Sequence, residues 1–412
     1  MKKISAILVV LCIALTCAFA QGGKEAPAAA ATAAPKETIK LTVWVGDLYT
    51  EVTEKIIEKF KAAYPDETFE ITVGIESEST CKDTVLTDPE AAADVYTFAD
   101  DQLLALVNAA AIQPATVDAD KVKTENGEGA VNAAIVDGQL YAYPMSASNG
   151  YFMYYDKSFF TEDDVKSLNT MAVKAAKAGK KVGMQFGADG GWYLYSFFKG
   201  AGLDMKINDD GMTNSCEWAS KGGEAVAKGI LDLVATGGFY ADSTSNLVSA
   251  AKDGTVVALV DGTWDANPIM EAYKDNYACC KLPTFSVSGK DVQMASFAGY
   301  KLIGVNPFSK NVGWAMRFAS FMTSEESQVA RFESNGDGPA NIKAAASASV
   351  ASNPAIAALA TQSQFATVQR VGGNYWTPAA TLGTILSQGN PEKTALSDLL
   401  STAVAGITAP VV

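Results

Sequence analysis

Three tryptophans stand directly after turns, where a flat ring can face a ligand. Trp192 follows a Gly-Gly pair, Trp264 follows Asp-Gly-Thr, and Trp376 follows Gly-Asn-Tyr. Aromatic faces pack against the apolar C–H faces of sugar rings, while carboxylates and amides bind the hydroxyl rim. Core packing explains any one of these tryptophans equally well. Three in equivalent positions favour a site for a neutral sugar or polyol.

The chain contains no histidine. It therefore lacks the commonest general base, the Ser-His-Asp and Cys-His arrangements, and imidazole metal ligands. Neither a Walker A sequence nor a GxGxxG motif is present. The pairs Asp100-Asp101 and Asp163-Asp164 leave a secreted glycosidase as an alternative, although adjacent side chains on a strand point apart. We predict a protein that is not an enzyme, with no catalytic residue and no cofactor.

One segment approaches the pattern of a calcium-binding loop. Lys206, Asn208, Asp210, Gly211 and Glu217 have the spacing of an EF-hand, but Lys206 occupies the first ligand position, where Asp is required. A cation at that position opposes calcium. We interpret the segment as a polar turn and predict no metal site.

The chain is acidic and long. Its 412 residues include 32 Lys and Arg against 46 Asp and Glu, which gives a formal net charge of -14. Such a chain has no obvious affinity for phosphate backbones or anionic membranes, so we expect no nucleic-acid partner. The length exceeds one ordinary core and predicts two domains or more.

Residues 1–20 predict a secretory signal peptide, because a basic start and an apolar run precede the cleavage pattern Ala18-Phe19-Ala20. Lipoprotein cleavage before Cys17 is the alternative, since the preceding residues form a loose lipobox. Residues 21–38, rich in Ala and Pro, predict a mobile linker, with a frayed terminus as the alternative. Either cleavage places the protein in the periplasm or at the outer face of the cytoplasmic membrane, in the second case lipid-anchored through Cys17.

Four cysteines follow the signal region: Cys81, Cys216, Cys279 and Cys280. A disulfide among them is compatible with an extracytoplasmic location. Four cysteines allow three pairings, and the sequence does not choose between them.

Alternating and helical patterns predict an α/β fold. The expected strands are 39–45, 69–73, 93–98, 182–186, 256–260 and 297–306. The expected helices are 50–64, 102–108, 166–177, 225–235, 312–322, an Ala-rich 343–362 interrupted by Pro354, and 379–404. Strand, helix and strand in close succession require a parallel βαβ unit. Acidic residues after the third strand lie where such sheets bind ligands.

The segment 138–160 predicts a hinge. It begins as a strand, stops at Pro144, passes through small polar residues at 146–149, and resumes as an aromatic strand at 151–155. Proline cannot donate a ladder hydrogen bond, and small polar residues favour irregular backbone. We interpret the segment as a crossing between two bodies. An internal strand–loop–strand of one domain is the alternative.

These motifs, taken in order, resemble the extracellular solute-binding proteins of bacterial ABC importers, in the branch of maltose- and maltodextrin-binding proteins. The resemblance covers 39–404 and is carried by KLTVWVGD, ADVYTFADDQL, GQLYAYPMSASNGYFMYYDK, GTVVALVDGTW, FAGYKLIGVNPFSK and GGNYW. It implies a two-lobed, class II periplasmic-binding-protein-like α/β fold, each lobe a mixed sheet flanked by helices. The implied lobes are 39–146 plus 297–343 and 147–296 plus 344–412, with a hinge between them.

The resemblance also implies site residues. Asp101 matches the family's carboxylate for sugar hydroxyls, and Asp47 is a looser match. Trp264 and Trp376 match stacking aromatics, and either Trp192 or Tyr193 fills the place of another.

Two positions depart from the family's pattern. Ser148 stands where maltose-binding proteins have a Glu, and Gln102 stands where an Arg follows the strand-end Asp. These departures put the α-glucan specificity in doubt more than the family.

The implied function is capture of a neutral sugar by lobe closure, the sugar being maltose, a maltodextrin or another oligosaccharide. A monomer would then deliver that ligand to the permease subunits of an ABC transporter in the membrane. A binding protein for another solute, such as a polyol, is the alternative within the same class.

Overall fold

The computed structural model describes residues 37–187, 190–208 and 212–410. The predicted signal peptide, the lipobox and all but the end of the predicted linker lie outside the described residues. So do Asp210 and Gly211 of the predicted polar turn. Among the described residues no helix has the length and apolarity needed to cross a bilayer.

The first sheet has six strands. Its order is β17 (Ala366–Val368), β16 (Ser296–Val305), β3 (Val95–Ala99), β1 (Ile39–Val45) and β2 (Phe69–Ile75), and β6 (Tyr143–Gly150) also pairs with β16. The strand β1 is parallel to β2 and β3, whereas β16 is antiparallel to β3 and β6. The predicted βαβ unit is thus confirmed, with helix α1 (Thr50–Ala63) as its crossover.

The second sheet has five strands and is also mixed. Its order is β11 (Phe239–Ala241), β8 (Lys181–Met184), β12 (Val256–Asp261), β7 (Phe152–Asp156) and β13 (Tyr277–Cys280). The strands β11, β8 and β12 are parallel, and β7 is antiparallel to both of its neighbours. Three two-stranded ribbons complete the β structure of the described residues: β4 (Ile135–Val136) with β5 (Gln139–Leu140), β9 (Met205–Ile207) with β10 (Asn214–Cys216), and β14 (Thr284–Val287) with β15 (Lys290–Gln293).

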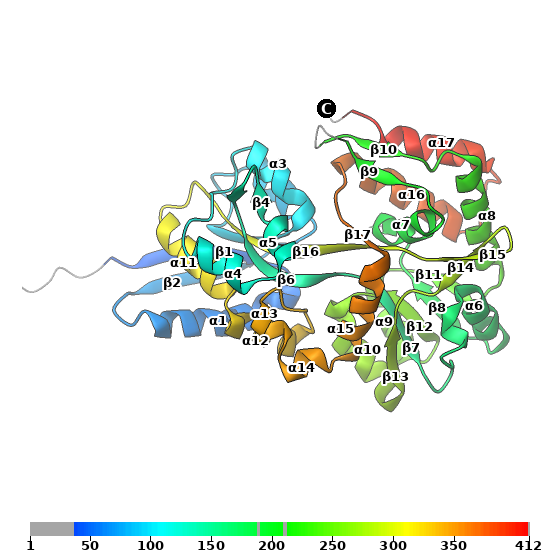
Figure 1. Ribbon diagram of the computed structural model, residues 1–412, viewed down its shortest axis with the longest axis horizontal. Coiled ribbons are helices and arrows are strands. Elements are labelled where there is room, and N and C mark those ends of the chain that lie inside the picture. Colours follow the sequence, from blue (N-terminus) through cyan, green and yellow to red (C-terminus); the bar gives the residue numbers. More distant parts are fainter. Residues whose placement is uncertain (1–36, 188–189, 209–211, 411–412) are drawn as a thin grey trace, which may run out of the picture. The chain divides into compact units, whose positions relative to one another are not determined.

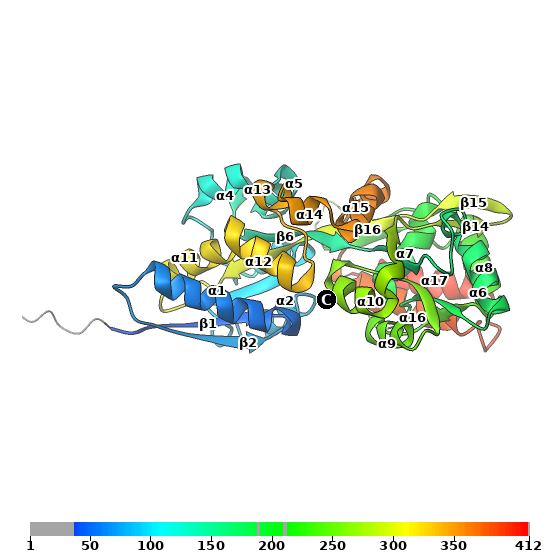
Figure 2. The ribbon, with the colours of Figure 1, turned by 90° about the horizontal axis from the view of Figure 1, so that it is seen from below.

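Helices flank both sheets (Figure 1). Besides α1 they are α2 (Cys81–Thr87), α3 (Leu103–Asn108), α4 (Ala119–Glu125), α5 (Glu128–Ala133), α6 (Leu168–Lys177), α7 (Gly190–Gly200), α8 (Lys221–Ala235), α9 (Thr244–Lys252), α10 (Ala266–Tyr273), α11 (Val312–Met322), α12 (Glu325–Asn335), α13 (Ile342–Ala345), α14 (Ala348–Ala351), α15 (Pro354–Gln362), α16 (Trp376–Ser387) and α17 (Leu396–Ile407). Figure 2 shows α1, α11 and α12 side by side along the first sheet, where they are in contact.

Each sheet has its own core. In β1 the burial alternates along the strand, and α1 turns Ile56, Ile57 and Phe60 onto it. The second sheet is covered on both faces, because successive residues of β7 enter different clusters. Met153 belongs to the cluster that includes side chains of α6, α7 and α16, and Tyr154 belongs to the cluster that includes side chains of α9 and α10. Alternation along a strand explains this division.

The segment after Pro144, predicted to be irregular, is part of a strand whose pairing is irregular. The strand β6 continues through Pro144 and residues 146–149 to Gly150, paired with β16 across two register shifts. These irregularities accommodate a residue without a donor in an otherwise continuous strand. One residue, Tyr151, then separates β6 of the first sheet from β7 of the second, so the chain does pass between two sheets here.

Two further expectations change. The Ala-rich stretch forms three short helices, α13 to α15, and Pro354 begins the last of them, a position that needs no backbone donor. The terminal helical region is likewise two helices, α16 and α17. All four cysteines of the described residues are free thiols.

Candidate functional site

Four of the site residues predicted from sequence share one local design. A strand or turn ends, a short 3-10 turn follows, and an α-helix begins. Asp47 opens the turn before α1, Asp101 lies in the turn before α3, Trp264 lies in the turn before α10, and Trp376 is the first residue of α16. Side chains at such positions stand at the end of a sheet and not within its core, which suits ligand binding.

Trp192 and Trp264 lie together. Their ring centroids are 5.6 Å apart with the planes inclined by 36°. Both side chains are partly exposed. Gly262 permits the Trp264 conformation, because a Cβ at that position would lie 2.0 Å from the indole. The Gly of the DGTW motif therefore lets the tryptophan ring fold back against its own turn.

Tyr193 lies beneath this pair. Its ring is 5.3 Å from that of Trp192, it is 3 % exposed, and its hydroxyl donates to the Asp261 carboxylate at 3.5 Å. The other carboxylate oxygen of Asp261, Oδ2, is buried without a hydrogen-bond partner in the described part of the chain. Burial, and then the charge of neighbouring Asp265, raises the pKa of Asp261 well above its ordinary value. Tyr193 thus supports the Trp pair from the core.

A glutamine that no sequence pattern marked contacts Trp192 and lies near Asp101. Gln369, 5 % exposed, accepts a hydrogen bond at 2.7 Å from the indole Nε1 of Trp192. Burial raises the pKa of Asp101 to about 6, and the nearby Gln369 amide opposes part of that rise. Oδ1 of Asp101 is buried and has no hydrogen-bond partner among the described residues. An acceptor in this state suits a ligand hydroxyl.

Asp100 has a different role from its neighbour. Its side chain is fully buried, accepts the backbone N–H of Tyr300 at 3.1 Å, and lies 3.2 Å from Nη1 of Arg370. Burial raises the pKa of Asp100 to about 7, and the Arg370 guanidinium opposes that rise. Arg370 also donates to the Asp100 carbonyl at 3.0 Å. A cation from a distant part of the chain thus lies beside the carboxylate pair, and no pattern in the sequence marked it.

Ser148 lies in a buried polar network. Its hydroxyl oxygen accepts from the backbone N–H of Gly338 at 2.7 Å and from Thr263 Oγ1 at 3.1 Å, and the hydroxyl donates to Asp337 at 3.4 Å. Ser148 therefore joins the strand β6 to the turn that carries Trp264. Its hydroxyl is occupied in this structure.

Lys301 extends the same network. Its ammonium contacts the Tyr49 hydroxyl, lies 3.5 Å from Oδ1 of Asp337, and stands 5.4 Å from the centre of the Trp264 ring. Arg331, 1 % exposed, also lies near Asp337. Burial lowers the pKa of Arg331 to about 10, and the negative charge of Asp337 opposes that fall. One carboxylate thus faces two buried cations.

The remaining predicted site residues, Trp376 and Asp47, have most of their contacts outside this group. Trp376 packs against the rings of Tyr375 and Phe297, with centroids 5.1 and 6.3 Å away. The start of its helix touches Gly191, next to Trp192. Asp47 is exposed, and no hydrogen bond ties it to the other predicted residues among those that the structure describes. The structure therefore brings together Asp101, Trp192, Tyr193, Trp264 and Ser148 more closely than Asp47 and Trp376.

Gln102 does not replace an arginine at the site. Its amide donates to the carbonyls of Glu78 and Ser79 and accepts from Lys82 N at 2.8 Å. Its side-chain amide is thus used to hold the start of α2 and the residues just before it.

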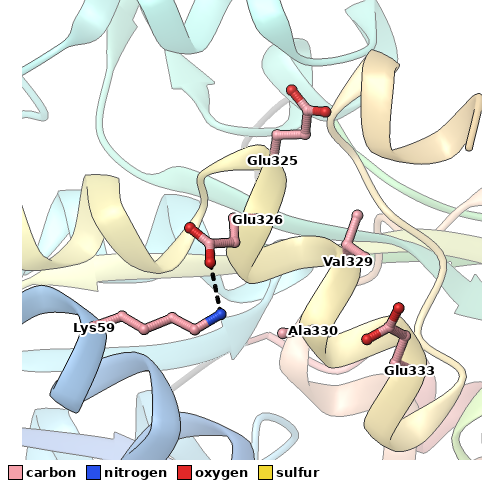
Figure 3. A pocket seen from close by; sticks show the side chains of 6 residues that line it. All are labelled: Lys59, Glu325, Glu326, Val329, Ala330 and Glu333. Atoms are coloured by element: carbon pink, nitrogen blue, oxygen red, sulfur yellow. Dashed lines mark hydrogen bonds and ion pairs between the residues drawn. The ribbon is translucent and has the colours of Figure 1, made fainter.

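Two surface hollows lie elsewhere. One of about 350 Å³ is formed by α1 and α12, where Lys59 pairs with Glu326 at 2.6 Å (Figure 3). The second, of about 440 Å³, lies between α8 and the β14–β15 ribbon. Neither is lined by a predicted site residue. Neither presents a partly exposed aromatic face, so they are poor candidates for a sugar site.

The comparisons with known proteins now decide the family. The family model described as bacterial extracellular solute-binding protein matches residues 55–358. This chain belongs to that family. The predicted resemblance and fold class are confirmed, and the bacterial extracellular solute-binding proteins are binding proteins and not enzymes.

Individual relatives agree with this assignment. A galactooligosaccharide-binding protein of Bacillus subtilis (strain 168) is 27 % identical over 335 residues, covering 77 % of each chain. A solved structure described as being with acarbose is 35 % identical, has a TM-score of 0.80, and is matched over 90 % of this chain and 99 % of its own. A maltodextrin-binding protein from L. casei BL23, solved without ligand, is 28 % identical with a TM-score of 0.76, over 91 % and 100 % of the two chains.

Proposed function

We propose that this chain is the extracytoplasmic binding component of an ABC importer and that its ligand is a neutral oligosaccharide. One observation carries the proposal: Trp192 and Trp264 form a partly exposed aromatic pair, and the buried Oδ1 of Asp101 lacks a donor among the described residues. Aromatic faces supply area for the C–H face of a sugar, and the carboxylate accepts its hydroxyls. The relatives named above, with acarbose, maltodextrins and galactooligosaccharides, support this ligand class.

Binding proceeds by a shift of population. A ligand that contacts residues attached to both sheets favours the conformation in which those contacts form together. Asp101 follows β3 of the first sheet, and Trp192 and Trp264 belong to elements that pack with the second. No covalent step is involved. The loaded protein then delivers the sugar to the membrane permease, and the monomer is exported by the signal peptide of residues 1–20 or anchored through Cys17.

The test is thermal unfolding of the mature chain with a panel of maltose, maltotriose, galactooligosaccharides, monosaccharides and polyols. A ligand that binds only the folded state stabilises it by about 2.7 kcal/mol at a hundred times its dissociation constant. We expect a rise in Tm with an oligosaccharide class and no new product after incubation. The absence of a shift with every carbohydrate would overturn the sugar assignment. A shift with polyols alone would establish the alternative, and released monosaccharide would establish a glycosidase.

Matched variants locate the site. Trp192→Ala should abolish most of the ligand-induced shift. Trp314→Ala is the control, because Trp314 packs against Phe60, Tyr64 and Phe69 beside the first sheet, away from the candidate residues. Mass spectrometry of the exported protein distinguishes cleavage after Ala20 from acylation at Cys17.

A further inference from the structure

Lys301 is a buried cation that lies beside the aromatic pair of the site. It is 7 % exposed and belongs to β16 of the first sheet. Lysine is almost never buried to this extent unless its charge is paired. The ammonium contacts the hydroxyl of Tyr49 and lies 3.5 Å from Oδ1 of Asp337, and the same hydroxyl donates to Oδ2 of Asp337 at 2.8 Å. The three groups form a closed triangle, which fixes the position of the Lys301 ammonium.

The ammonium of Lys301 faces two aromatic rings. It stands 4.8 Å from the centre of the Tyr49 ring and 5.4 Å from the centre of the Trp264 ring. A cation within about 6 Å of an aromatic centre is attracted to the ring face. Tyr49 is 2 % exposed and packs in the core of the first sheet, whereas Trp264 is partly exposed and precedes α10, which packs with the second sheet. Lys301 thus connects a core residue of one sheet to a site residue attached to the other.

Asp337 reaches the turn of Trp264 by a second route. Its Oδ1 accepts a hydrogen bond from the Ser148 hydroxyl at 3.4 Å. The oxygen of Ser148 in turn accepts from Oγ1 of Thr263, the residue before Trp264, at 3.1 Å. One carboxylate is therefore connected to the backbone turn through Ser148 and to the indole ring through Lys301. The ring and the turn that carries it share a single anchor.

We propose that Lys301 is the positioning residue for Trp264. Its ammonium, held by Tyr49 and Asp337, fixes the orientation in which the Trp264 ring forms one aromatic surface with Trp192. This inference rests on the proposed function for its ligand, whereas the orientation of the ring is a property of the free protein. Lys301 acts on the sugar through the Trp264 ring, so its effect on affinity should disappear when the indole is absent.

The first test is a double-mutant cycle on maltotriose affinity, measured by calorimetry. Lys301→Met keeps an unbranched side chain and removes the cation. Alone it should weaken binding by roughly three- to thirtyfold, the range for the loss of one cation–π contact. In a Trp264→Leu background the same change should cost less than about twofold, because the two residues act as a unit. An equal loss in both backgrounds would overturn the proposal, since Lys301 would then act independently of the ring.

A second readout follows the ring in the ligand-free protein. The Nε1–H resonance of Trp264 is assigned through Trp264→Phe. This resonance should move in Lys301→Met, and an unmoved resonance would overturn the proposal. If Lys301→Met does not fold, Tyr49→Phe carries the test, because it removes one anchor of the ammonium and keeps the buried ring. The Trp264 resonance should then move in Tyr49→Phe, and its constancy would be equally decisive against the proposal.

Arg317→Met is the matched control. The Arg317 guanidinium stands 5.1 Å from the centre of the Trp314 ring, which packs beside the first sheet and away from the candidate site. The substitution therefore removes the same kind of contact from another tryptophan. It should move the Trp314 resonance and leave both the Trp264 resonance and maltotriose affinity unchanged. A Trp264 resonance that moves as far in Arg317→Met as in Lys301→Met would also overturn the proposal.

The two readouts separate this inference from the proposed function. If the wild-type protein binds no saccharide, the proposed function fails. The resonances of the ligand-free variants still decide whether Lys301 orients Trp264.

Discussion

The indole rings of Trp192 and Trp264 stand 5.6 Å apart, inclined by 36°, although 72 positions separate them in the chain. A sugar ring between two aromatic faces needs two contact distances of about 3.5–4.0 Å each, so this spacing leaves no room for a sandwich. The two rings instead form one continuous platform, and we expect a ligand to lie on it while its hydroxyls reach Asp101.

Removing the ring of Trp264 or of Trp376 should weaken sugar binding. Trp264→Ala deletes half of the platform, and Trp376→Ala deletes the ring at the start of α16. Each should cost about 1–3 kcal/mol of sugar affinity, from the loss of buried ring surface. Calorimetric titration with the oligosaccharide that shifts the wild-type Tm measures this. Because Trp264 lies against Trp192 and Trp376 does not, we expect the larger loss for Trp264. Normal affinity in both variants would mean that the site lies elsewhere.

Asp101→Asn should separate affinity from stability. The substitution replaces an acceptor that has an unpartnered Oδ1 by an amide, so binding should weaken by on the order of 1.5–3 kcal/mol, the range for a hydrogen bond to a charged group. The ligand-free protein should keep its Tm at pH 7 or gain slightly, because burial disfavours the charged form. A marked loss of Tm together with retained affinity would identify Asp101 as a structural carboxylate.

Asp100 predicts a pH dependence of stability. Its folded-state pKa of about 7 lies above the ordinary value of 3.8. The folded state therefore holds this proton more tightly than the unfolded state, so the contribution of Asp100 to stability is fully present below about pH 4 and is lost as the pH rises towards 7. The difference in unfolding free energy between wild type and Asp100→Asn, measured from pH 4 to pH 8, should follow this course. A difference that does not vary with pH would contradict it.

The buried cations around Asp337 predict which of two substitutions, Asp337→Asn or Lys301→Met, destabilises the fold more. Lys301→Met leaves Asp337 with Arg331 nearby, whereas Asp337→Asn leaves two buried cations without this carboxylate. Breaking a buried pair costs about 3–5 kcal/mol, and we expect Asp337→Asn to cost more than Lys301→Met. Urea unfolding of the two variants gives the comparison. An equal or greater loss for Lys301→Met would contradict this order.

Local sequence patterns predicted most helices and strands, because the periodicity that produces each of them is a local property of the sequence. The strand 39–45 and the helix 312–322 were predicted with the bounds that the structure has. Their apolar residues recur at the period of the element, which any single chain displays. Local patterns did not predict that β6 continues through residues 146–149, since its partner β16 lies some 150 positions away in the sequence; the local preference of Pro, Ser and Asn survives only as two register shifts.

Some residues of the candidate site could likewise be predicted from local sequence patterns, and others could not. Trp192, Trp264 and Asp101 could be selected beforehand, because turns after strands and the family resemblance marked them. Gln369, Arg370 and Lys301 could not, because each acts through partners from distant segments. A glutamine before a Gly-rich turn, or a lysine in a strand, has no distinctive pattern of its own.

The sequence by itself determined the α/β class, the family and the chemical character of the candidate site, since composition, periodicity and ordered motifs are properties of the chain as written. The tertiary structure alone decided which side chains share hydrogen bonds and charges. Asp100 and Asp101 are neighbours in the chain, yet folding places Arg370 against one and Gln369 against the other. Burial and opposite charge act over a few ångströms in space, so their effects depend on contacts that only the folded chain creates.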